Sequence, residues 1–201
     1  MHKVFISYHH ENDQWAKNKL LLWNYEEDIF IDRSVDTGDI SDELTDEEIR
    51  VKIRDEYLRD STVTILLVGQ ETRFRKHIDW ELYSSMRNSP RNGKSGIIVV
   101  MLPDVARDYF TCGHGDKEKA LYPETTNWTT INERSKYEER YPYMPDRIID
   151  CLVAMNSHIS VVKWEKIASN HEILRTLIDL AHRDKDKSIY DLSRPMRRRN
   201  G

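Results

Sequence analysis

Two continuous runs of β-branched and apolar residues constrain the fold of this chain more than any other feature. Residues 63–68 read Val-Thr-Ile-Leu-Leu-Val, and residues 97–102 read Ile-Ile-Val-Val-Met-Leu. Both lack the regular polar alternation of a strand that faces water on one side. Strands of this kind are covered on both faces, so the runs predict the centre of a parallel sheet that lies between two layers of helices.

Amphipathic segments alternate with the strand-like runs along the chain. The clearest begins at Thr45, which with Glu48 three residues later forms a capping-box pattern. This alternation is typical of a doubly wound, flavodoxin-like α/β fold, with a parallel sheet of about five strands flanked by helices. We expect the strands at residues 3–7, 29–32, 62–68, 96–102 and 158–164.

The length of 201 residues favours a single domain over residues 1–201. Periodicity is lost at about 103–145, which predicts a loop-rich insertion. It has few aliphatic residues but many aromatic ones, which suit stacking on flat ligands or anchoring a partner. The aromatic residues are Tyr109, Phe110, Tyr122, Trp128, Tyr137, Tyr141 and Tyr143. Residues 190–201, with three consecutive arginines, predict a flexible, solvated C-terminal tail.

Composition excludes several classes of partner. The formal net charge is -4 and the pI about 6.1, which argues against nucleic-acid binding. No segment approaches the roughly 20 apolar residues of a membrane span, and the first residues carry no secretion signal. Cys112 and Cys151 lack metal-site spacing, so we expect free thiols and no metal. These features predict a cytoplasmic protein without membrane or nucleic-acid partners.

Ligands of open α/β sheets bind beyond the carboxyl ends of the strands. No G-x-G-x-x-G or Walker A loop occurs there. Glu81 borders the apolar stripe of the helix expected at 73–88, with His77 four residues earlier on the same side. A carboxylate at such a border can be desolvated and chemically useful. Most helix glutamates are solvated instead, and the spacing alone leaves both interpretations open.

Three segments resemble the motifs of TIR domains. Phe5-Ile6-Ser7-Tyr8 resembles the opening motif, and residues 53–67 resemble the second helix, its serine and the third strand. Residues 77–82 resemble the Trp-Cys-x-x-Glu-Leu motif that carries the catalytic glutamate of NAD-cleaving members. This sequence departs from that motif, because His77 replaces the first Trp and Trp80 directly precedes Glu81. The resemblance covers about residues 1–102.

Within the TIR-like proteins, the chain looks most like the ThsB-like proteins of bacterial Thoeris anti-phage systems. The features are the acidic loop at 36–43, Gln70, the insertion at 103–145 and the Pro-Asp-Arg-Ile-Ile segment that begins at Pro145. The resemblance implies an enzyme with NAD as substrate and no cofactor. Its product would be a cyclic or conjugated ADP-ribose signal that reaches a separate effector protein by diffusion.

For this sequence, the resemblance implies that Glu81 is catalytic and that Ser7, Tyr8 and His77 bind substrate. It also implies a lid role for the acidic loop at 36–43, a phage-derived trigger and a homo-oligomer. The change at His77 leaves an alternative open, a non-catalytic TIR-like adaptor that acts by assembly with itself or with a partner.

Overall fold

The computed structural model describes residues 1–34, 44–58, 60–88 and 93–201. It contains a five-stranded, all-parallel sheet in the order β2-β1-β3-β4-β5. The strands are β1 (Lys3–Ser7), β2 (Ile31–Asp32), β3 (Val63–Val68), β4 (Gly96–Met101) and β5 (Ile159–Lys163). Every residue of β3 and β4 is buried, as the two continuous runs predict. The doubly wound α/β fold is confirmed.

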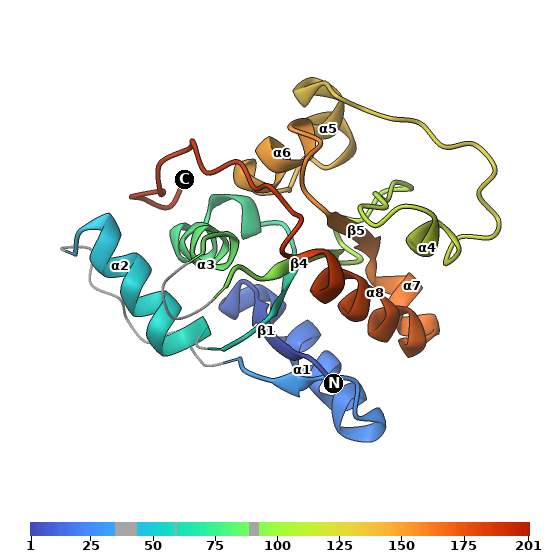
Figure 1. Ribbon diagram of the computed structural model, residues 1–201, viewed down its shortest axis with the longest axis horizontal. Helices are drawn as coiled ribbons and strands as arrows, with labels where there is room; N and C mark the ends of the chain where they lie inside the picture. Colours follow the sequence, from blue (N-terminus) through green and yellow to red (C-terminus); the bar gives the residue numbers. More distant parts are fainter. Residues whose placement is uncertain (35–43, 59, 89–92) are drawn as a thin grey trace.

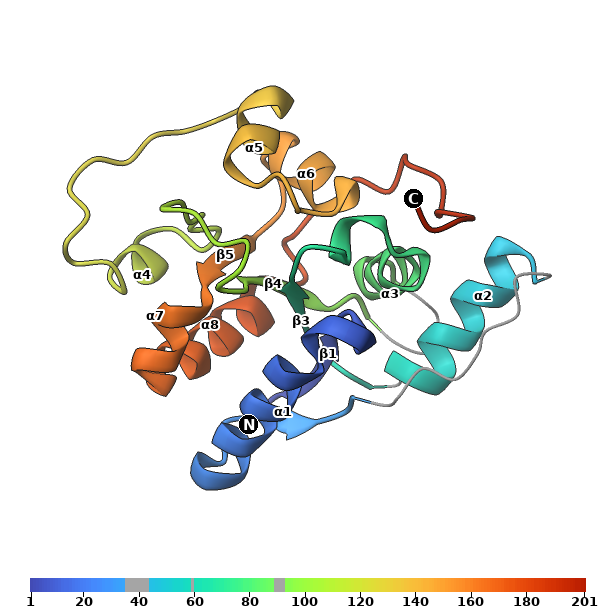
Figure 2. The same ribbon diagram turned by 180° about the vertical axis from the view of Figure 1, so that it is seen from behind.

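Helices cover both faces of the sheet (Figures 1 and 2). One face packs against α1 (His10–Glu27), α7 (Trp164–Ser169) and α8 (His171–Asp184). The other packs against α3 (Lys76–Met86), α5 (Arg134–Arg140) and α6 (Asp146–Val153). In the described ranges, no helix is long and apolar enough to cross a membrane.

The predicted capping box is present at the start of α2 (Asp46–Lys52), which continues into a π-helical turn (Ile53–Leu58). The backbone N–H of Thr45 donates to Glu48 Oε2 at 2.8 Å, and the N–H of Glu48 donates to Thr45 Oγ1 at 3.3 Å. Ile49 and Ile53 pack with Phe5 of β1 and Trp80 of α3. These contacts fix α3 against the first strand.

The insertion at 103–145 contains the short helix α4 (Asp116–Lys119) and the helix α5, joined by irregular segments. Thr111 forms an antiparallel bridge with Val161 of β5, with both N–H···O distances at 2.9 Å. The edge strand β5 is therefore covered by the insertion, which protects its free hydrogen-bonding groups.

Part of the C-terminal segment, which we predicted to be a solvated tail, packs on α3, while residues 198–201 are exposed. It contains no helix or strand, yet Met196 is buried. The indole Nε1 of Trp80 donates to the carbonyl oxygen of Arg197 at 2.7 Å, and the Arg197 N–H donates to Asp79 at 2.8 Å. Figure 1 shows the C-terminus beside α3.

A buried ion pair explains this packing. Arg147 of α6 donates two hydrogen bonds to the Asp79 carboxylate, at 2.8 and 3.1 Å, and its side chain is fully buried. The guanidinium has five N–H donors, and the carbonyl oxygens of Arg194 and Pro195 accept from it at 3.1 and 3.2 Å. The tail thus completes the hydrogen bonding of a charge that burial would otherwise leave unsatisfied.

Candidate functional site

The strand order places the switch point of the sheet between β1 and β3, where ligands of doubly wound folds bind. Ser7 is the last residue of β1, and Glu81 comes from α3, the helix that follows β3. The Ser7 hydroxyl donates a hydrogen bond to Glu81 Oε2 at 2.6 Å. Both side chains are almost inaccessible, with Ser7 at 1% and Glu81 at 4% exposure. The structure therefore brings two of the predicted site residues into direct contact.

The environment of Glu81 changes its acidity. Burial raises the pKa of Glu81 to about 7, while the hydrogen bond from Ser7 and the positive charge of Lys17 act in the opposite direction. The carboxyl group of Glu81 therefore changes between its protonated and ionised forms near neutral pH. A group that titrates there is suited to chemistry that depends on its charge.

Lys17 is a member of this cluster that the sequence analysis did not identify. It lies on α1 with 7% exposure, and its Nζ donates to the Tyr8 hydroxyl at 3.3 Å. Asp13 and Leu20 are buried on the same helix, four residues before and three residues after Lys17. A lysine at helical spacing between buried residues is the signal that could have revealed it. The mixed apolar pattern of residues 10–27 obscured that spacing.

Residues 5–107 match the family model described as Thoeris protein ThsB, TIR-like domain. The matched segment is just over half of the chain. The chain belongs to this family. The match begins at the first strand and includes Ser7, Lys17 and Glu81, so the resemblance stated from the sequence motifs is confirmed. No curated protein and no solved structure matches the chain.

The ThsB-like chain holds Tyr8 and His77 away from the hydroxyl–carboxylate contact. The Tyr8 hydroxyl donates to Gln14 Oε1 at 2.7 Å, because successive side chains at the end of β1 point to opposite faces and Tyr8 points to α1. Tyr8 is linked to Glu81 only indirectly, through Lys17. His77 lies edge-on to the Trp80 ring at 4.9 Å. Substrate binding by these two residues stays a prediction.

A pocket of about 340 Å³ opens at the carboxyl ends of the strands. It is lined by Asn12, Asp13, Trp15, Gln70, Pro103 and Asp104. Burial, with Asp104 nearby, raises the pKa of Asp13 to about 6. A Cβ atom at Gly69 would lie 2.5 Å from Asp13 Oδ1, so a larger residue here would displace the Asp13 carboxylate.

Glu81 does not line this pocket. The Ser7–Glu81 contact is therefore buried, and neither of its residues lines this pocket. The acidic loop at 36–43, for which we predicted a lid role, lies outside the described residues.

One group of side chains elsewhere has the spacing of a metal site. Donor atoms of His114, His158 and Asp184 lie within 4.8 Å of one another. Asp184, however, already accepts from His114 Nδ1 at 2.9 Å and pairs with Arg183 and Lys187. Arg183 beside it holds the pKa of Asp184 far below its usual range. We interpret the group as an ion-pair network that fixes the end of α8.

Proposed function

We propose that this ThsB-like chain is an NAD-consuming enzyme that produces a cyclic or conjugated ADP-ribose signal, which activates a separate effector in anti-phage defence. The observation that supports this most is the buried contact between Ser7 and Glu81 at the switch point of the sheet. It joins the two motifs in which the sequence resembles NAD-cleaving TIR domains.

The chemistry needs few groups. Cleavage of the bond between nicotinamide and ribose sends the electron pair to the pyridinium nitrogen, so nicotinamide leaves as a neutral molecule. Positive charge develops on the ribose, and a carboxylate in a dry site stabilises it strongly. A hydroxyl group of the same nucleotide then attacks the ribose and closes a ring, or an O–H or N–H group of a second small molecule attacks and gives a conjugate. Either attack releases one proton. In this scheme Glu81 supplies the negative charge, and Ser7 orients the carboxylate.

The alternative is a non-catalytic adaptor that acts by assembly. It is favoured by the 4% exposure of Glu81 and by His77 at the position of the motif's Trp. The enzymatic proposal requires the Ser7–Glu81 contact to open to substrate, whereas an adaptor requires no such opening.

Mass spectrometry of nucleotides from infected cells separates the two functions. Cells with the wild-type chain should accumulate an ADP-ribose product, and cells with Glu81→Gln should not, at equal amounts of folded protein. If the two cultures contain the same nucleotides and resist phage equally, Glu81 is not catalytic and the adaptor explains the defence.

A further inference from the structure

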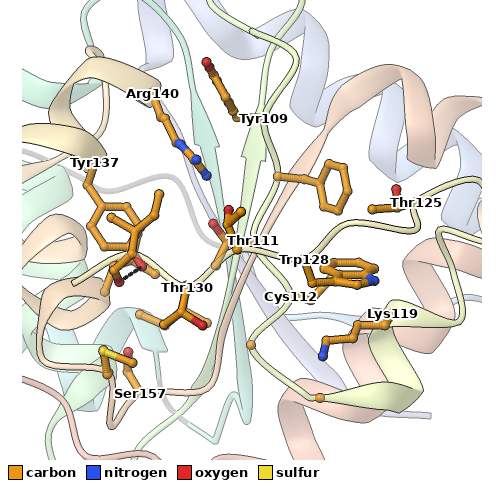
Figure 3. Close-up of a pocket in the computed structure, with 18 of the residues that line it drawn as sticks. Tyr109, Thr111, Cys112, Lys119, Thr125, Trp128, Thr130, Tyr137, Arg140 and Ser157 are labelled. Carbon is orange, nitrogen blue, oxygen red and sulfur yellow. Dashed lines mark hydrogen bonds between the residues drawn. The ribbon is translucent and has the colours of Figure 1, made fainter. Parts of the chain in front are cut away.

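A larger pocket, of about 530 Å³, lies between the insertion and β5 (Figure 3). All of its lining residues fall between Asp108 and Ile159, beyond the segment matched by the family model and apart from the Ser7–Glu81 contact. Its volume is within the range of about 300–1,000 Å³ typical of small-molecule sites. The pocket is therefore large enough to hold a ligand of its own.

Aromatic rings form the walls of this pocket. Phe110 stacks on the buried ring of Tyr122 at 4.0 Å, and Trp128 lies edge-on to Phe110 at 5.7 Å. These contacts fix the indole in position, yet Trp128 remains 38% exposed and Tyr109 39% exposed. Rings that only packed the edge of the sheet would be buried, as Tyr122 is. Trp128 is instead held and partly exposed, with Lys119 Nζ 5.3 Å from its ring centre, so a flat group can stack on the part of the ring that the ammonium group leaves open.

The charges at the pocket are mainly positive, in a chain whose net charge is -4. Figure 3 shows Lys119 beside Trp128 on one side and Arg140 beside Tyr137 on the other. The Arg140 guanidinium lies 4.7 Å from the centre of the Tyr109 ring, and none of the described carboxylates forms an ion pair with it. Lys119 Nζ forms an ion pair with Asp116 Oδ1 at 3.6 Å, and the Asp116 side chain is fully exposed.

The acid that lines the pocket does not cancel these charges. Asp108 points into solvent, where it pairs with Lys163 at 3.0 Å. The two cations on opposite sides of the pocket thus favour an anionic ligand. Arginine offers a planar fork of N–H donors that matches carboxylate and phosphate oxygens.

The remaining groups suit binding more than catalysis. Burial raises the pKa of the Cys112 thiol well above its usual range, so the thiol stays protonated and is a poor nucleophile. The Thr111 hydroxyl shares a hydrogen bond of 2.9 Å with Tyr141. Thr125, Thr129 and Thr130 add hydroxyl groups to the lining, which can donate to or accept from a polar ligand.

We propose that this pocket is a second ligand site, which binds a small anion that carries a flat ring, namely a nucleoside monophosphate. Arg140 binds the phosphate group on one side of the pocket, and Trp128, which lies beside Lys119 on the other side, stacks on the base. The site is independent of NAD cleavage, because it shares no residue with the cluster around Glu81.

Calorimetric titration of the full chain with AMP tests the proposal, with adenosine and inorganic phosphate as partial ligands. AMP should bind at least tenfold more tightly than either. Arg140→Gln and Trp128→Leu should each weaken AMP binding at least tenfold. The matched control is Arg107→Gln, since Arg107 lies in the same insertion outside the pocket lining and donates to the Glu139 carbonyl oxygen. It should change the affinity less than twofold, as should Glu81→Gln.

A second measurement needs no variant that alters the pocket's charge. The chain has five tryptophans, so its indole N–H resonances can be followed one by one during an AMP titration of the wild-type protein. The Trp128 resonance should shift most, and Trp128→Phe, which keeps an aromatic ring, assigns it. The proposal is overturned if AMP does not bind, or if the Trp128 resonance does not move. It is equally overturned if Glu81→Gln abolishes AMP binding while Arg140→Gln retains it, because AMP then occupies the NAD site.

Discussion

Two glutamates are buried in the described part of the chain, and burial raises the pKa of both, but their partners differ. Glu81 is on α3 near the centre of the sheet, and Glu118 is on α4 at the β5 edge. Burial raises the pKa of each to about 7. Glu81 accepts from the Ser7 side chain at 2.6 Å, whereas Glu118 accepts from the backbone N–H of His114 at 2.9 Å.

The difference shows that burial and a raised pKa do not identify a reactive carboxylate. Glu118 lies on the four-residue helix α4. Its carboxylate accepts the hydrogen bond of the buried backbone N–H of His114, just before that helix. Glu81 belongs instead to a cluster of side chains that converge from separate elements at the switch point. Glu118 is therefore a control for Glu81, because burial raises its pKa in the same direction while it lies at the β5 edge, away from the switch point.

The largest effect should come from Glu81→Gln, compared with Glu118→Gln. Gln keeps the volume of the side chain and removes its charge. Loss of one preorganised electrostatic group costs about 2.7–4 kcal/mol in the transition state, or roughly 10²–10³ in rate. Glu81→Gln should lose NAD consumption by that factor, and Glu118→Gln should stay within a few fold of wild type. NAD loss is measured by chromatography, with purified protein and in lysates of infected cells.

The melting temperature of each sample shows whether its chain is folded. Equal activity in the two variants would contradict the proposed division between a catalytic and a structural glutamate. A loss of activity confined to Glu118→Gln would reverse the assignment.

Folding stability should depend more on Glu118 than on Glu81, which is the opposite of the order expected for activity. Glu118→Ala leaves the buried N–H of His114 without its acceptor, which costs about 1–3 kcal/mol of unfolding free energy. Glu81→Gln should cost less than about 1 kcal/mol at pH 6, because the neutral amide replaces a largely protonated carboxyl and can still accept from Ser7. Urea denaturation of both variants at pH 6 measures the two values. If Glu81→Gln is the more destabilising, Glu81 has the structural role.

The sequence predicts what depends on local pattern. The apolar, β-branched runs predicted four strands to within one residue at each end, because a continuous run of this kind marks a buried strand by its local composition. The second strand begins at Ile31 instead of residue 29. The capping box of Thr45 and Glu48 is likewise local. Glu81 was found through its motif, since spacing alone does not separate it from a solvated helix glutamate.

The features that escaped prediction depend on contacts between distant residues. The packed C-terminal segment follows from the ion pair of Asp79 and Arg147, which are 68 positions apart, and from backbone carbonyl groups that no side-chain pattern reveals. Lys17 of α1 lies close enough to affect the pKa of Glu81 of α3 because both helices pack near β1 in the folded chain. The insertion's aromatic composition suggests a ligand or partner surface, which stays a prediction. Composition also does not show which rings are buried, as Tyr122, Tyr137 and Tyr141 are.

The activity should depend on pH through Glu81 and not through Glu118. The carboxylate form is the one that stabilises positive charge, so kcat/KM should fall about tenfold for each pH unit below 7. Glu118→Gln should retain this acidic limb. The stability of the fold depends on pH in the opposite direction. In the folded chain the pKa of Glu81 lies above its ordinary value of 4.5. The contribution of Glu81 to the free energy of unfolding is therefore complete below about pH 4.5 and is lost as the pH rises through 7.

Two profiles check this point, kcat/KM against pH and the free energy of unfolding against pH. Glu81→Gln should remove part of the downward slope in stability between about pH 4.5 and 7. An activity profile that is flat between pH 5 and 7 in the wild-type chain would mean that Glu81 does not act as a carboxylate.

The smallest effect should come from Lys17→Met, which tests whether the lysine tunes Glu81. The positive charge of Lys17 lowers the pKa of Glu81, so its removal should move the acidic limb of the kcat/KM profile to higher pH, while the plateau at high pH changes little. Lys17→Arg keeps a charge on α1 and should leave the limb near its wild-type position. A change in the plateau without a shift of the limb would assign Lys17 to substrate contact or to the packing of Tyr8, with which it shares a hydrogen bond of 3.3 Å. Lys17 lies on α1 and Glu118 on α4 at the β5 edge, so Lys17→Met should leave the stability cost of Glu118→Ala unchanged. If the changes in unfolding free energy add in the Lys17→Met/Glu118→Ala double variant, the two glutamate sites are separate. A coupling energy above about 0.5 kcal/mol would show that the two sites interact.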